Sequence, residues 1–124
     1  VTLFPYTTLF RSDKKVKEIM RYISNNFTLE TNPGLPEKQA KEGLFNYYRI
    51  MAEALNALGD QKVETSKGKR ITWAQDLSKH LKSLQKEDGS WVNEGSPRWM
   101  EGNPDLVTAY AILALVACRD NLSK

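Results

Sequence analysis

The chain has 124 residues, a net charge of +3, 40% hydrophobic residues and 27% charged residues. These values are typical of an ordinary globular domain or of part of one. Lysines and arginines are scattered among the acids without a basic block, which argues against a nucleic-acid partner. The most apolar stretch, Leu106 to Cys118, is shorter than the roughly 20 residues that a membrane-spanning helix needs. We therefore expect a soluble protein without a transmembrane segment.

Residues Thr2 to Ser12 read TLFPYTTLFRS and resemble a translated sequencing adaptor joined in frame to a gene. We interpret residues 1–12 as such an artefact and residues 13–124 as the domain. The chain is then a fragment of a bacterial-type protein, and its sequence does not determine its localisation. The alternative is an authentic arm, because Phe4, Tyr6 and Phe10 favour extended structure.

The first half of the domain predicts two helices. One runs from Asp13 to about Asn26, with apolar residues on one side and basic residues on the other. After a loop that contains prolines, the second is expected from about Gln39 to Leu58, with Gly59 as its stop. Its wide apolar face predicts that it is mostly enclosed.

The second half predicts two more helices. A polar segment, with Lys67-Gly68-Lys69 as its turn, is typical of a small hairpin. Thr72 and Gln75 then have the spacing of a capping box, which would begin a half-exposed third helix. Asn103 and Pro104 have the pattern of a helix start. The helix that follows is apolar on nearly every side, which predicts that protein surrounds it.

The two halves resemble each other. A shift of 62 residues lays the second helix over the fourth, so that Tyr48 matches Tyr110 and Ile50 matches Ile112. Each helical hairpin is therefore interpreted as one repeat, and such repeats bury their faces by stacking on neighbours. We expect amphipathic helices in an outer ring and apolar helices in an inner ring. Two hairpins cannot close such a ring, so a large apolar flank should be exposed.

The segment from Leu84 to Trp91, LQKEDGSW, resembles the QW repeat of the squalene and oxidosqualene cyclases and their prenyltransferase-like relatives. In that pattern a helix ends in Gln, here Gln85, and is followed by Gly89 and Trp91. The glutamine can serve free carbonyl groups, the glycine permits a tight turn, and the tryptophan can join neighbouring repeats. The resemblance implies an all-α fold: two hairpin repeats at the C-terminal end of an α/α toroid, with earlier repeats of the same chain missing.

The resemblance also implies that the intact protein binds an isoprenoid-type small molecule, or cyclises it as a polyene substrate in the manner of a terpene cyclase (an isomerase). Aromatic and polar residues could line its cavity, because aromatic faces suit an isoprenoid chain. The candidate substrate-binding residues are Tyr47, Tyr48, Arg98, Trp99, Glu101 and Tyr110. Trp99 is the strongest candidate, since it lies in a loop before an inner helix. Alternatively, the aromatic residues only fill a core, and Arg98 and Glu101 form a surface ion pair.

Catalytic residues are not identifiable. The Asp-x-Asp-Asp acid motif of the cyclases does not occur in this sequence, so the fragment itself is expected to be inactive. A zinc site is not predicted, because Cys118 lies in an apolar helix and His80 on a polar helix face. We expect no metal and no cofactor. The resemblance leaves room for peripheral membrane contact by the intact protein.

Two other interpretations stay open. One is a non-enzymatic toroid that binds a peptide, a glycan or a protein at the cavity of the ring. The other is an unrelated helical solenoid, which an exposed Trp91 would support.

Overall fold

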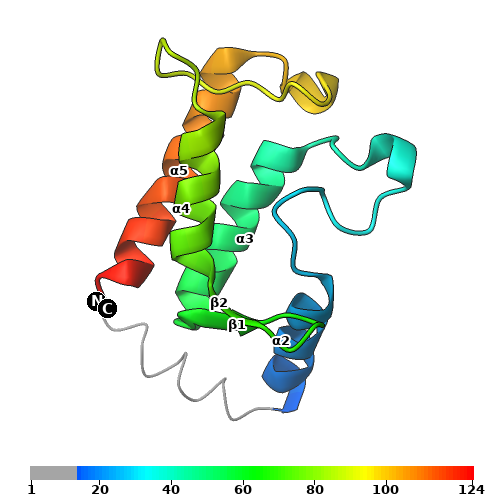
Figure 1. Cartoon of the computed structure of the whole chain (residues 1–124), viewed down its shortest axis with the longest axis vertical. Helices are drawn as coiled ribbons and strands as arrows, with labels where there is room; N and C mark the ends of the chain where they lie inside the picture. Colours follow the sequence, from blue (N-terminus) through cyan, green and yellow to red (C-terminus); the bar gives the residue numbers. More distant parts are fainter. Residues whose placement is uncertain (1–13) are drawn as a thin grey trace.

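The structure is a computed structural model that describes residues 14–124. The interpretation of Thr2 to Ser12 lies outside this range. The described chain is mostly helical, with one small sheet, as Figure 1 shows. Its elements are α2 (Lys14–Asn26), the 3-10 helix η1 (Glu37–Gln39), α3 (Leu44–Leu58), β1 (Lys62–Glu64), β2 (Arg70–Thr72), α4 (Trp73–Leu84), the 3-10 helix η2 (Arg98–Met100) and α5 (Pro104–Leu122). The helical class is confirmed, whereas the ring of repeats stays a prediction.

Helix α3 begins later than predicted. Gly43 adopts a left-handed conformation, with φ of 63°, directly before the first helical residue. The segment from Gln39 therefore belongs to a 3-10 turn and its continuation, not to α3. The predicted stop is confirmed, because Gly59 is left-handed and its N–H donates to the carbonyl groups of Leu55 and Asn56 over 3.1 and 3.0 Å.

The predicted hairpin between the two halves is present. Strands β1 and β2 are antiparallel, with Val63 opposite Ile71, and Gly68 in the turn has a φ of 77°. The prediction of a capping box at the start of α4 was wrong, because the side chain of Thr72 makes no capping hydrogen bond. Thr72 ends β2, where it is paired with Lys62 in the sheet.

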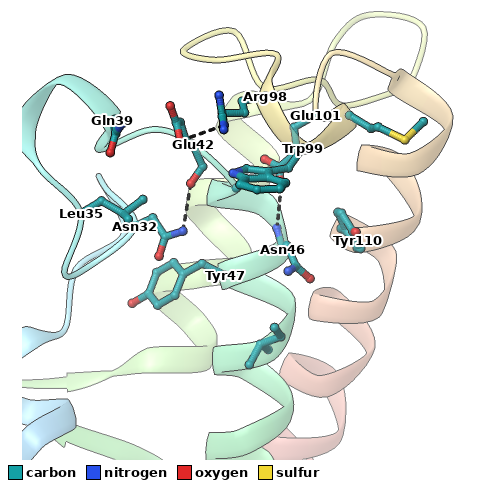
Figure 2. Close-up of a pocket in the computed structure, with 13 residues that line it drawn as sticks. Asn32, Leu35, Gln39, Glu42, Asn46, Tyr47, Arg98, Trp99, Glu101 and Tyr110 are labelled. Carbon is teal, nitrogen blue, oxygen red and sulfur yellow. Dashed lines mark hydrogen bonds and ion pairs between the residues drawn. The ribbon is translucent and has the colours of Figure 1, made fainter.

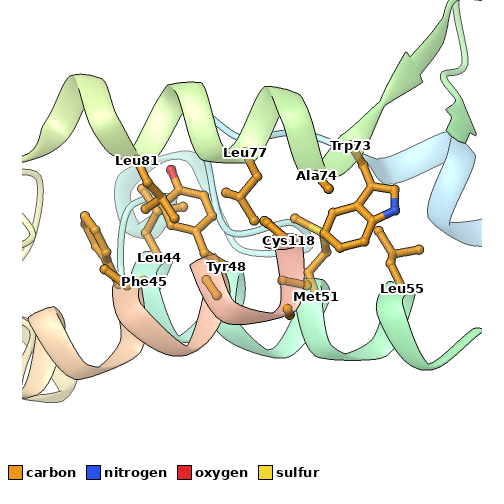
Figure 3. Packing of buried hydrophobic residues seen from close by; sticks show 14 of the residues in the cluster. Leu44, Phe45, Tyr48, Met51, Leu55, Trp73, Ala74, Leu77, Leu81 and Cys118 are labelled. Carbon is orange, nitrogen blue, oxygen red and sulfur yellow. The ribbon is translucent and has the colours of Figure 1, made fainter. Parts of the chain in front are cut away.

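Helices α3 and α5 lie side by side and run in the same direction, and α4 runs the opposite way against them (Figure 1). At one end, the Lys124 ammonium, just past α5, donates to the carbonyl of Asn56 in the last turn of α3. The core fills the space between the three helices, and Figure 3 shows its packing. Its largest fully buried apolar side chains are those of Trp73, Tyr48, Leu55, Leu77 and Leu81.

Helices α2 and α4, which begin the two predicted hairpins, pack in different ways. Helix α2 contacts β1 at the end of the bundle, while α4 packs along α5 (Figure 1). Met20 and Ile23 of α2, with Phe27 just past its end, are half-buried against the core, as the amphipathic pattern predicted. The two predicted hairpins are therefore not equivalent in their packing.

An apolar flank is exposed on the bundle, as predicted. Ile50 of α3 is 50% exposed, and its repeat equivalent Ile112 of α5 is 51% exposed. Leu113 and Val116 lie exposed on the same helix as Ile112. Helix α5 is thus buried along one side only, not on nearly every side. No helix in residues 14–124 combines the length and the hydrophobicity that crossing a bilayer requires.

Candidate functional site

An open depression of about 830 Å³ lies at the end of the bundle where α3 and α5 begin (Figure 2). Its floor is the first turns of α3, and its walls come from the loop before α3, from η2 and from α5. The lining residues are Asn32, Leu35, Gln39, Glu42, Gly43, Asn46, Tyr47, Ile50, Arg98, Trp99, Met100, Glu101 and Tyr110. Five of the six predicted site residues therefore meet in one depression.

Glu101 is the buried centre of this end of the molecule. Its side chain has no exposed surface, and its carboxylate accepts the backbone N–H groups of Phe45 and Asn46, each over 3.0 Å. These are the second and third residues of α3, whose N–H groups have no partner within the helix. Because Gly43 at the N-cap has no side chain to accept them, Glu101 takes that role from a distant loop.

A buried asparagine completes this anchor. The Asn93 amide donates to Glu101 over 3.0 Å and to the carbonyl of Lys41 over 2.7 Å, and its backbone N–H donates to the Glu101 carbonyl over 2.9 Å. Sequence reasoning did not single out Asn93. Gly43 indicates only that the helix start has no side-chain cap of its own, and it does not identify the residue that supplies one.

Trp99 and Met100 have an unusual backbone. Their φ angles are 59° and 63°, in the left-handed region that residues with side chains seldom adopt. The Trp99 side chain is nevertheless 65% exposed, and Figure 2 shows its indole lying above the start of α3. Two consecutive residues in this region indicate a loop whose surroundings impose its shape, as ligand-binding loops often do.

Arg98 stacks on that indole. Its guanidinium lies 4.9 Å from the centre of the Trp99 ring, and its Nε atom is 3.6 Å from the carboxylate of Glu42. The surface ion pair with Glu101, one of the sequence interpretations, is therefore not formed. Glu42 is the partner that sequence reasoning missed.

The three tyrosines of the predicted lining have different surroundings. Tyr110 borders the depression, with the Arg49 guanidinium 5.5 Å from the centre of its ring. Tyr47 also borders it, while its hydroxyl donates to the carbonyl of Thr28 over 2.9 Å. Burial raises the pKa of Tyr47 above its ordinary value, so the phenol is neutral at physiological pH.

Tyr48 does not reach this depression. It is fully buried in the core, and its hydroxyl donates to the carbonyl of Leu29 and lies 3.0 Å from Nε2 of His80. Burial strongly raises its pKa. His80 was interpreted as a solvated surface residue, but this contact makes it a half-buried partner of Tyr48.

The QW-like segment has a structural role, with its parts arranged differently from expectation. The Gln85 amide donates to the carbonyl of Gly89 over 2.9 Å, so it closes the turn and not the helix end. Gly89 has a φ of 89°, which explains the glycine. Trp91 is buried, and its indole N–H donates to the carbonyl of Leu81 over 2.8 Å. The exposed Trp91 that would have supported an unrelated solenoid is not observed.

The residues weighed for a metal site are separate. Cys118 is buried, and burial raises the pKa of its thiol. Across residues 14–124, no three His, Cys, Asp or Glu side chains gather where they could hold a metal ion.

No protein-family model, no curated protein and no solved structure matches this chain. The depression at the start of α3 is therefore interpreted from its own geometry.

Proposed function

We propose that this chain is the C-terminal part of a squalene cyclase and prenyltransferase-like helical protein, and that its depression binds an apolar, isoprenoid-type ligand. The family rests on the resemblance of the QW-like segment. The observation that supports binding is the exposed indole of Trp99, which the loop holds over the depression in a left-handed backbone. Large exposed aromatic surface beside a concave site is typical of ligand recognition.

The apolar surface of the depression comes from several elements. Leu35 precedes α3, Ile50 lies on α3, and Tyr110 lies on α5, and all three border the same space as Trp99 and Met100. A flexible hydrocarbon chain gains affinity by burying such surface, at roughly 25 cal/mol for each Å² removed from water. An open trough of this kind suits a chain with little polar functionality.

The carboxylates at the depression support binding more than catalysis by this part of the chain. The Glu101 carboxylate is fully buried and accepts three N–H groups, so it has no surface to offer a ligand. Glu42 is engaged by Arg98. A reaction of the intact protein would therefore take its acid from other residues.

Equilibrium dialysis with radiolabelled farnesol, below its aggregation concentration, tests this proposal. Saturable binding is expected for the unmodified chain, with strongly weakened binding for Trp99→Ala and Tyr110→Ala. Ile19→Ala is the matched control, because Ile19 is an exposed apolar residue on α2 that does not border the depression. Binding that does not saturate, or that survives both aromatic substitutions, would overturn the proposal.

A glycan is the second candidate, and a specific observation favours it. The polar side chains of Asn32, Gln39 and Glu42 border the same depression as Trp99. Sugars combine apolar C–H faces with hydroxyl groups, so an indole with amides and a carboxylate beside it fits them. The same dialysis with soluble oligosaccharides distinguishes the candidates, since a glycan-binding site would retain oligosaccharide and not farnesol.

A further inference from the structure

We infer that Glu101 is a positioning residue, which holds the indole of Trp99 over the depression by fixing the η2 loop to the start of α3. The inference deepens the proposed function and rests on it only for the identity of the ligand. The placement of Trp99 itself can be measured without any ligand.

The η2 loop needs a restraint that holds it in place. Trp99 and Met100 lie in the left-handed region, and a loop that contains two such residues would relax if nothing restrained it. Trp99 is largely exposed, so burial of its own side chain provides little restraint. Hydrogen bonds of the buried residues on either side of the loop, Asn93 and Glu101, can supply the restraint.

Glu101 forms hydrogen bonds through both its backbone and its side chain. Its backbone N–H donates to the carbonyl of Arg98 over 3.3 Å, and its carbonyl accepts the N–H of Asn93 over 2.9 Å. Its carboxylate holds the N–H groups of Phe45 and Asn46 on α3. One buried residue therefore joins both ends of the loop to the helix that forms the floor of the depression (Figure 2).

The Trp99 indole lies close to the start of α3. Trp99 is two residues before Glu101, and a Cβ atom on Gly43 would lie 3.8 Å from Cδ1 of the indole. The indole thus sits against the backbone at the start of α3, where the carboxylate is bonded. A loop released from α3 would carry Trp99 away from the other aromatic residues of the depression.

The test replaces Glu101 by glutamine, which keeps the size of the side chain but turns an N–H group toward one of the three donors. The matched control is Glu94→Gln, because Glu94 is in the same connecting segment and its side chain is 80% exposed. Each protein is labelled with 5-fluorotryptophan, and Trp99→Phe assigns the ¹⁹F resonance of Trp99. Farnesol dialysis is run on the same samples.

In Glu101→Gln we expect the Trp99 resonance to shift toward the position of a freely mobile indole, while those of Trp73 and Trp91 stay in place. Farnesol binding should weaken roughly tenfold, which corresponds to about 1.4 kcal/mol of binding free energy. The control should match the unmodified chain. An unchanged Trp99 resonance in a folded Glu101→Gln protein would overturn the inference, and so would farnesol binding of undiminished strength.

Two further outcomes distinguish a failure of the inference from a failure of the proposed function. If the unmodified chain binds no farnesol but the substitution still frees Trp99, the ligand is wrong and the positioning role holds. If Glu101→Gln does not fold, amide hydrogen exchange of the unmodified chain replaces it. On mild heating, the amides of Phe45 and Asn46 should begin to exchange at the same temperature at which the Trp99 indole becomes mobile. If the two changes occur at different temperatures, the loop and the start of α3 are not coupled.

Discussion

The indole N–H of Trp91 is bonded to the carbonyl of Leu81, in the last turn of α4. The N–H of Gln85, four residues further on, donates to the carbonyl of Lys82 instead of that of Leu81. The backbone N–H of Trp91 donates to the hydroxyl of Thr108 on α5 over 3.0 Å. Trp91 thus completes one helix end and attaches it to the neighbouring helix.

Replacing Trp91 by alanine should therefore lower the free energy of unfolding by about 3 to 5 kcal/mol, as for other buried large aromatic residues. Trp91→Phe keeps most of the ring and loses the hydrogen bond, so it should cost less. Denaturant titration measures both. Tyr22→Ala is the control, because Tyr22 is 66% exposed and should change stability by no more than about 0.5 kcal/mol. A loss of that small size for Trp91→Ala would rule out its role as a staple.

The two helix starts with polar caps should respond differently to alanine. The side chain of Asn103 accepts the N–H of Asp105 over 2.9 Å, so Asn103→Ala should cost about 1 kcal/mol. Thr72 makes no such bond before α4, so Thr72→Ala should leave the capping contribution unchanged. Thermal melting of the two variants compares them directly. Equal losses would mean that Thr72 does cap α4 in solution.

Glycine at position 100 should stabilise the protein. Met100 has a φ of 63°, which costs a residue with a side chain roughly 1 to 2 kcal/mol, and its side chain is mostly exposed. Met100→Gly removes that strain, but the greater flexibility of glycine in the unfolded chain offsets part of the gain. The net increase in the free energy of unfolding should be about 0.5 to 1 kcal/mol. Met100→Ala keeps the strain and is the control. If glycine and alanine have the same effect in denaturant titration, the left-handed conformation is not strained.

Alkaline pH should unfold the protein through its buried tyrosines. Burial raises the pKa of Tyr47 and Tyr48 in the folded state, while in the unfolded state it stays near the ordinary value of 10.0. The contribution of the two neutral phenols to the free energy of unfolding is complete below pH 10.0. It is lost as the pH rises above that value, because the unfolded chain releases these protons more readily than the folded chain. Tyr48→Phe should flatten the fall of unfolding free energy above pH 10, whereas Tyr22→Phe should not. An unchanged slope in Tyr48→Phe would show that another group controls alkaline unfolding.

The parts of the fold that local sequence determines were predictable. Gly59 at the end of α3 and the Asn103-Pro104 start of α5 carry their signals within a few residues. The start of α3 was missed because its capping group lies 56 residues from Phe45 in the sequence. No local pattern reports such a partner.

The candidate site was predictable in part for the same reason. Trp99 and Tyr110 border one depression, next to the loop before α5 where the rim of a cavity was expected, and their role in substrate binding stays a prediction. Tyr47 and Tyr48 are consecutive, and a helix turns neighbouring side chains about 100° apart, so both could not face the same space. Only the packing against α4 and the loop after α2 decides that Tyr48 turns inward.

The dependence of α3 on Glu101 also constrains the order in which the molecule can assemble. A nascent chain makes all of α3 well before residue 101 leaves the ribosome, so the first turn of the helix must wait with its N–H groups open to water. Closing so long a loop is slow compared with forming a local helix. We therefore expect the beginning of α3 to become ordered last, together with the depression.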